Sequence, residues 1–63
     1  MTQKELLYVE DAYNHEKYII DICNNIIYNN DDSNLIKFIN NEIDKHETMK
    51  NKLYKLMENK VNE

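Results

Sequence analysis

The stretch Asn29-Asn30-Asp31-Asp32-Ser33-Asn34 separates two long runs in which apolar residues recur at helical spacing. Asn commonly ends helices, Asp and Ser cap their first turns, and such a cluster is typical of a tight connection. The chain contains no Gly and no Pro, so neither run has a residue that would break a helix. We therefore predict a helix over about 3–28, a turn over 29–33 and a second helix over about 34–60.

The beginning of the first predicted helix has the form of a capping box, Thr2-Gln3-Lys4-Glu5. In such a box the Thr2 side chain accepts a hydrogen bond from the backbone of Glu5, and the Glu5 side chain reaches back to Thr2. Two helices of about 40 Å joined by a short connection lie antiparallel. The predicted fold is all-α, a single domain formed by an antiparallel two-helix hairpin.

The apolar face of each predicted helix is wider than one helix–helix seam requires. At about 100° per residue, the apolar positions are Tyr8, Val9, Ala12, Tyr13, Ile19, Ile20, Ile22, Cys23, Ile26 and Ile27 in the first helix and Leu35, Ile36, Phe38, Ile39, Ile43, Met49, Leu53, Leu56 and Met57 in the second. A lone hairpin would leave part of these faces in water, which soluble monomers avoid. We therefore expect two hairpins to pair as a homodimer, forming a ferritin-like four-helix bundle.

The composition excludes several functional classes. A net charge of -4 without a basic stripe argues against a nucleic acid or an acidic membrane as partner. The absence of Gly excludes glycine-rich phosphate loops and nucleophile elbows, and Ser33, the only serine, has no base nearby. We expect Cys23, the only cysteine, to be a small buried hydrophobe rather than a reactive thiol. These features predict a non-enzymatic, unexported protein located in the cytoplasm.

Three ionisable residues interrupt the apolar faces: Glu16 in the first helix and Glu42 and His46 in the second. A buried carboxylate requires a partner, because its desolvation costs several kcal/mol. If the turn is centred near Asp31, residues whose numbers add up to about 62 lie at the same height. Glu16 then faces His46, and Glu42 lies one helical turn nearer the connection. His15 and Glu47 are further candidates for this level.

This polar layer has two interpretations that the sequence leaves open, and in a third the helices rotate slightly so that Glu16 escapes to the rim of the seam. In a symmetric dimer the set would be doubled, and its carboxylates and imidazoles would suit iron, manganese or zinc as in ferritin-like di-metal sites. The metal ligands would be Glu16, Glu42 and His46 of each chain. Without metal, a buried Glu–His layer can set the register of a bundle at a cost in stability. We favour the metal-free interpretation.

The string Asn41-Glu42-Ile43-Asp44-Lys45-His46-Glu47-Thr48-Met49 resembles the Glu-Ile-x-x-His-Glu segment of the coat F family of spore coat proteins in bacilli and clostridia. The residues Glu5-Leu6-Leu7-Tyr8-Val9-Glu10-Asp11-Ala12, followed by His15-Glu16-Lys17, are similar to the beginning of short clostridial members. The resemblance implies a ferritin-like helical architecture, location in the spore coat and an assembly role in sporulation, with other coat proteins as partners.

Two departures from known patterns limit what the resemblance implies. Longer coat F relatives carry a full four-helix unit, whereas this chain would supply half of one. Glu42 and His46 are four residues apart, where ferritin-like enzymes have a spacing of three, so oxidase or iron-storage activity is not carried over.

The helical-hairpin aspartyl-phosphate phosphatases of sporulation fit the size, but their Ser-x-x-x-Asp motif is missing, because Lys37 follows Ser33 at that spacing.

Overall fold

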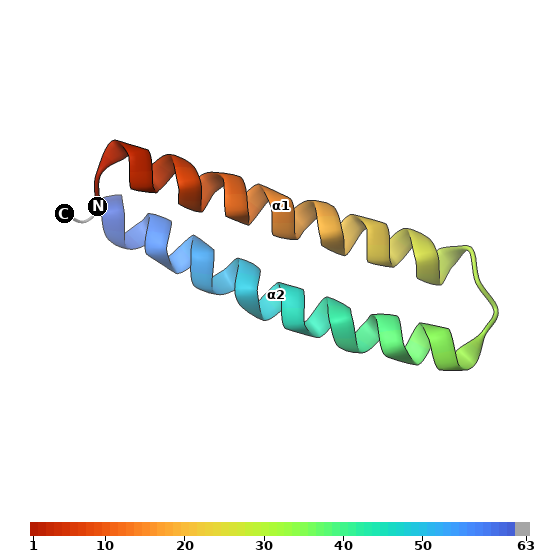
Figure 1. Ribbon diagram of the computed structural model, residues 1–63. Helices are drawn as coiled ribbons and strands as arrows, with labels where there is room; N and C mark the ends of the chain where they lie inside the picture. The colour runs from red at the N-terminus through yellow and green to blue at the C-terminus, as the bar shows by residue number, and fades with distance from the viewer. Residues whose placement is uncertain (62–63) are drawn as a thin grey trace.

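A computed structural model describes residues 1–61 of the chain, with side chains through residue 59. The described chain consists of two helices, α1 (Gln3–Tyr28) and α2 (Ser33–Val61), which lie side by side and antiparallel (Figure 1). The molecule measures 47 × 14 × 11 Å along its principal axes. The predicted all-α hairpin is thus confirmed, while the pairing of two hairpins stays a prediction.

The capping box begins α1 as expected. The backbone N–H of Glu5 donates to Thr2 Oγ1 at 3.1 Å, and the backbone N–H of Thr2 donates to Glu5 Oε1 at 3.0 Å. The hydrogen bonds from the Thr2 backbone and side chain hold the pKa of the Glu5 carboxyl below its ordinary value of 4.5. The two reciprocal bonds satisfy backbone donors that a helix start otherwise leaves without an intrahelical partner.

Asparagine side chains end α1. The side-chain amide of Asn29 donates to the carbonyl of Asn25 at 2.8 Å, and that of Asn30 donates to the carbonyl of Ile26 at 2.7 Å. Asn29 has φ of -100° and ψ of 10°, so the helix ends here without a left-handed residue. The Asn30 amide takes the place of a backbone donor at Ile26, whereas the carbonyl of Asn25 also accepts from the backbone N–H of Asn29 at 3.1 Å. The helix can therefore end without a glycine.

Asp32 caps the start of α2, which begins at Ser33, one residue earlier than the sequence predicts. Its Oδ1 accepts hydrogen bonds from the backbone N–H groups of Asn34 at 2.9 Å and Leu35 at 3.1 Å. The sequence offered both Asp and Ser as caps, and the structure selects Asp32, which leaves Ser33 as the first helical residue. The connection between the helices is therefore a four-residue turn over residues 29–32.

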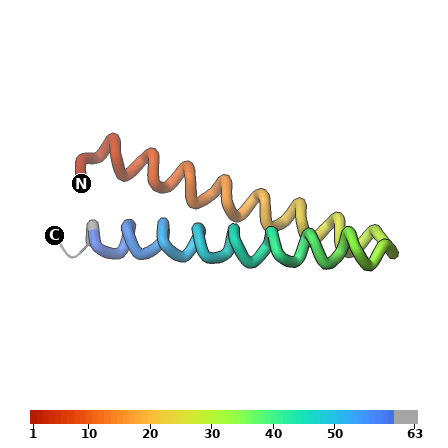
Figure 2. Tube along the Cα trace, turned by 60° about the horizontal axis from the view of Figure 1, so that its bottom comes forward, coloured from red at the N-terminus to blue at the C-terminus, as the bar shows by residue number. Residues whose placement is uncertain are grey.

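The two helices meet along one seam, whose residues are buried or half-buried and recur at alternate spacings of three and four. These seam residues are Leu6, Val9, Tyr13, Glu16, Ile20, Cys23 and Ile27 in α1 and Ile36, Ile39, Ile43, His46, Lys50, Leu53 and Met57 in α2. Figure 2 shows the helices inclined to each other, as expected when side chains of one helix fit between those of the other. Neither helix of the described chain is long and apolar enough to cross a membrane.

Among the described residues, three side chains form the buried core. Ile20 and Cys23 in α1 are each 7% exposed, and Ile39 in α2 is 8% exposed. Cys23 is a buried free thiol, in the environment that the sequence predicted for it. Two helices can enclose only a single layer of side chains. For this reason no large side chain in the described part of the chain is fully buried.

Candidate functional site

The interhelical pair Glu16–His46 lies in the seam. Glu16 Oε2 from α1 and His46 Nδ1 from α2 are in direct contact, and the two side chains are 16% and 28% exposed, respectively. This contact confirms that Glu16 and His46 share one height along the hairpin. Because both groups are half-buried, each serves as the other's polar partner.

Glu42 lies beside this pair rather than within it. Its Oε1 is 3.2 Å from Nζ of Lys45, on the same helix, and its side chain is 29% exposed. Position 42 directly precedes the seam residue Ile43, so its side chain is turned by about 100° around the helix from that of Ile43 and lies at the margin of the seam. Glu42 therefore finds its counter-charge on its own helix, whereas Glu16 finds its partner across the hairpin.

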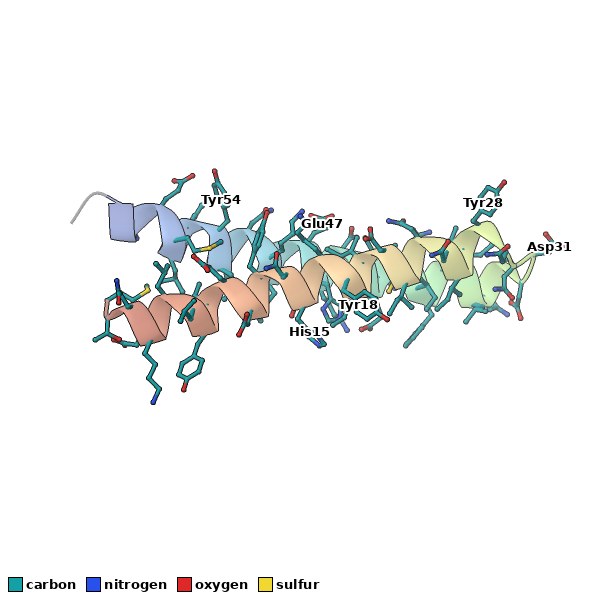
Figure 3. All side chains as sticks on the ribbon, turned by 90° about the horizontal axis from the view of Figure 1, so that it is seen from above. His15, Tyr18, Tyr28, Asp31, Glu47 and Tyr54 are labelled. Carbon is teal, nitrogen blue, oxygen red and sulfur yellow. The ribbon has the colours of Figure 1, made fainter. Side chains whose placement is uncertain are left out.

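His15 and Glu47 lie on opposite edges of the hairpin. Figure 3 shows His15 and Tyr18 along one long edge and Glu47, Tyr54 and Tyr28 along the other. His15 is exposed, and Glu47 Oε2 forms an ion pair with Lys50 Nζ at 3.1 Å. The sequence made both residues candidates for the polar layer around Glu16 and His46, but neither of them lies in the seam beside that pair.

A three-ligand metal site is not formed within one chain. Over the residues that the structure describes, no three His, Cys, Asp or Glu side chains come together in a group that could hold a metal ion. Of the predicted ligands, Glu16 and His46 are brought together, and Glu42 is engaged with Lys45. A metal would therefore need ligands from a second chain in addition to this pair.

One edge of the hairpin, which we call the apolar side, carries half of the exposed large apolar side chains of the described residues. It is the edge on which His15 lies in Figure 3. Counting in steps of 100° from the seam places these residues there: Tyr8, Ala12, Ile19, Ile22 and Ile26 from α1 and Leu35, Phe38, Met49 and Leu56 from α2. Tyr8 is 61% exposed and Phe38 is 59% exposed, so the largest members of this side have no covering layer within the chain.

The opposite edge, which we call the polar side, has a different composition. Its residues are Glu10, Asn14, Lys17, Asp21 and Asn24 from α1 and Lys37, Asp44, Glu47, Asn51, Tyr54 and Glu58 from α2, together with the exposed Leu7 and Tyr28. The rings of Tyr13 and Tyr54 approach to 6.1 Å here, and Lys17 Nζ lies 5.7 Å from the Tyr13 ring. These contacts cover the seam on the polar side, and charged groups face the solvent beyond them.

The segregation into two sides was missed in the sequence, although a signal for it exists. Ala12, Ile19 and Ile26 are seven residues apart, and Leu35, Met49 and Leu56 share a second series with the same repeat. Each series flanks the seam in its own helix. In an antiparallel pair, equivalent flanking positions of the two helices lie on the same edge, so the two series form one continuous surface.

Comparison of the chain with protein-family models, curated proteins and solved structures finds no match.

Proposed function

We propose that this protein is a non-enzymatic structural or assembly protein whose working unit is a homodimer, in which two hairpins form a ferritin-like four-helix bundle. The observation that carries the proposal is the row of exposed apolar residues beside a seam with only three buried side chains, Ile20, Cys23 and Ile39. A core of this size provides only a few kcal/mol of stability. Covering the apolar side with a second chain would supply the missing burial.

In the described part of the chain the side chains of the two helices meet directly along the seam, and no pocket forms between them. The most distinctive polar contact, Glu16–His46, is also turned toward the seam rather than toward an opening.

The resemblance of segments 5–17 and 41–49 to the coat F family supports a setting in sporulation. In that setting the bundle would be laid down in the spore coat after synthesis in the cytoplasm, and other coat proteins would be its further partners. Extraction of purified spores tests this part separately, since we expect the protein in the coat fraction. Its absence from spores would contradict the coat assignment and leave the dimer in place.

Sedimentation equilibrium at micromolar concentrations tests the homodimer. The chain has a mass of 7.7 kDa, and we expect about twice this mass for the folded protein. Far-UV circular dichroism of the same samples establishes that the protein is helical. A helical species that sediments as a single chain at these concentrations would contradict the proposal.

A metal-binding bundle is the alternative, and the Glu16–His46 pair is the observation in its favour. Two such pairs, supplemented by Glu42 of each chain, would give oxygen and imidazole ligands suited to iron, manganese or zinc. Metal-free protein can be incubated with each ion and analysed for bound metal after desalting, with His46→Ala as the matched control. Uptake of less than one ion per dimer, or equal uptake by the control, would contradict this alternative.

A further inference from the structure

We propose that the apolar side is the dimer interface, and that a second copy of this chain docks on it while the polar side stays in water. The interface would be formed around Ile22, Phe38, Met49 and Leu56, with the Glu16–His46 pair inside each hairpin rather than between the two chains. This inference rests on the proposed function, because it presupposes a homodimer.

The chain exposes more surface than a compact protein of its mass. The accessible surface is 5048 Å², whereas a compact monomer of this mass is expected to expose roughly 4,300 Å². Each partner contributes roughly 800 Å² to a stable protein–protein interface. One long edge of a rod measuring 47 × 14 × 11 Å can provide an area of this order.

The residues of the apolar side are those that stabilise interfaces. Phe38 is 59% exposed, Met49 47%, Leu56 44% and Ile22 40%. Between them lie Ile19 and other half-buried aliphatic residues, so a partner would meet a largely apolar surface, interrupted by the Glu42–Lys45 pair. Aromatic residues and Met are enriched at the centre of protein–protein interfaces, where a few of them supply most of the binding energy.

The charges on the two sides favour the same assignment. On the polar side acidic residues outnumber lysines: Glu10, Asp21, Asp44, Glu47 and Glu58 against Lys17 and Lys37. A second copy of this side would be repelled. The apolar side and its outer margin carry both signs: Lys4, Lys45, Lys52 and Lys55 with Glu5, Asp11 and Glu42. A surface with both signs can be complementary to itself, which a two-fold interface requires.

The Glu42–Lys45 ion pair lies within the apolar side and fits an interface between copies. Lys45 is 72% exposed and Glu42 is 29% exposed, at an N–O distance of 3.2 Å. The pair neutralises Glu42 before a second chain approaches, so docking would not bury a lone carboxylate. The pairing of Glu42 with Lys45 therefore lowers the cost of burying this part of the apolar side.

A pair of matched substitutions tests the assignment. Phe38 on the apolar side and Leu7 on the polar side are both 59% exposed, so either can be replaced without disturbing the seam. We expect Phe38→Glu to weaken dimerisation by roughly a hundredfold, as for replacement of a central interface residue. Leu7→Glu should leave the dissociation constant within about threefold of the original protein. Dissociation constants from sedimentation equilibrium measure both effects, and circular dichroism checks helicity.

A second measurement works without any substitution. In a mixed dimer of isotope-labelled and unlabelled chains, filtered NMR spectra report contacts between chains. We expect such contacts from the Phe38 ring and the Ile22 methyl groups, and none from Leu7. A dimer that Phe38→Glu leaves intact, or contacts between chains through Leu7, would overturn the assignment of the interface. A monomeric original protein would instead overturn the proposed homodimer itself.

Discussion

The Glu16–His46 pair lies near the middle of both helices and divides the hairpin into a turn half, residues 17–45, and a chain-end half, which comprises residues 3–16 and 46–61. The two halves share one seam but differ in the side chains that fill it. All three buried side chains, Ile20, Cys23 and Ile39, lie in the turn half. In the other half, the seam positions are held by Tyr13, Glu16, His46 and Lys50 among aliphatic residues, and none of these four is fully buried. The spacing of seam positions is the same throughout, so only the chemistry of the side chains changes.

The two halves therefore stabilise the hairpin in different ways. The turn half gains its stability from apolar burial, which is roughly proportional to the area removed from water and has no preferred direction. The other half contains the directional contact Glu16–His46, which is satisfied only when the two helices have the right register and rotation. One half therefore contributes most of the stability, and the other contributes alignment.

The largest effect should come from removing apolar volume in the turn half. We expect Ile39→Ala to lower the free energy of unfolding by about 2–4 kcal/mol, because Ile39 is only 8% exposed and its loss leaves a cavity. The matched change Leu53→Ala, at a half-buried seam position in the other half, should cost about 1 kcal/mol. Urea unfolding at one fixed protein concentration measures both values. Equal losses at the two positions would contradict the contrast between the halves.

An intermediate effect should follow from converting the polar layer into an apolar one. Glu16→Ala leaves His46 without its partner, and we expect a loss of about 1–2 kcal/mol in the free energy of unfolding. The double variant Glu16→Leu/His46→Leu should instead gain about 1–3 kcal/mol, because it extends the apolar seam and removes the desolvation cost. Denaturant unfolding gives both values. If the double variant is less stable than Glu16→Ala, the pair contributes stability rather than alignment.

The smallest effect belongs to the capping box at the chain-end half. The pKa of Glu5 is lowered from 4.5 by hydrogen bonds from Thr2, so the carboxylate contributes stability above pH 4.5. This contribution is lost as the pH falls through the lowered pKa, because the protonated group is a weaker acceptor. An NMR titration of the Glu5 side chain should have its midpoint below 4.5. Thr2→Ala, which removes the side-chain bond, should move the midpoint upward, and an unchanged midpoint would contradict this account.

Much of the fold could be predicted because its signals are local. The bounds Gln3–Tyr28 are those expected for the first helix, since the capping box and the asparagines after Tyr28 act within one helical turn. The second helix differs by one residue at its start, where Asp32 is the cap. The facing of Glu16 and His46 was also predictable, because a short turn and two straight helices leave little freedom in register.

The finer arrangement of the polar residues could not be predicted in the same way. Glu42 lies about 100° from its neighbour Ile43 around the helix, and the broad apolar arc of α2 would admit either residue at its centre. How far α2 rotates about its own axis depends on all seam contacts together. That rotation directs Glu42 toward Lys45 and leaves His15 and Glu47 on opposite edges.

The amino-acid sequence alone determined the two helices, their connection and the height at which Glu16 meets His46, because caps, turns and helical rise are properties of neighbouring residues. The tertiary structure decided which of the candidate polar groups enter the seam and that the remaining apolar residues collect on one edge. These outcomes depend on the inclination and rotation of one helix against the other, which only the packing of all seam side chains can set.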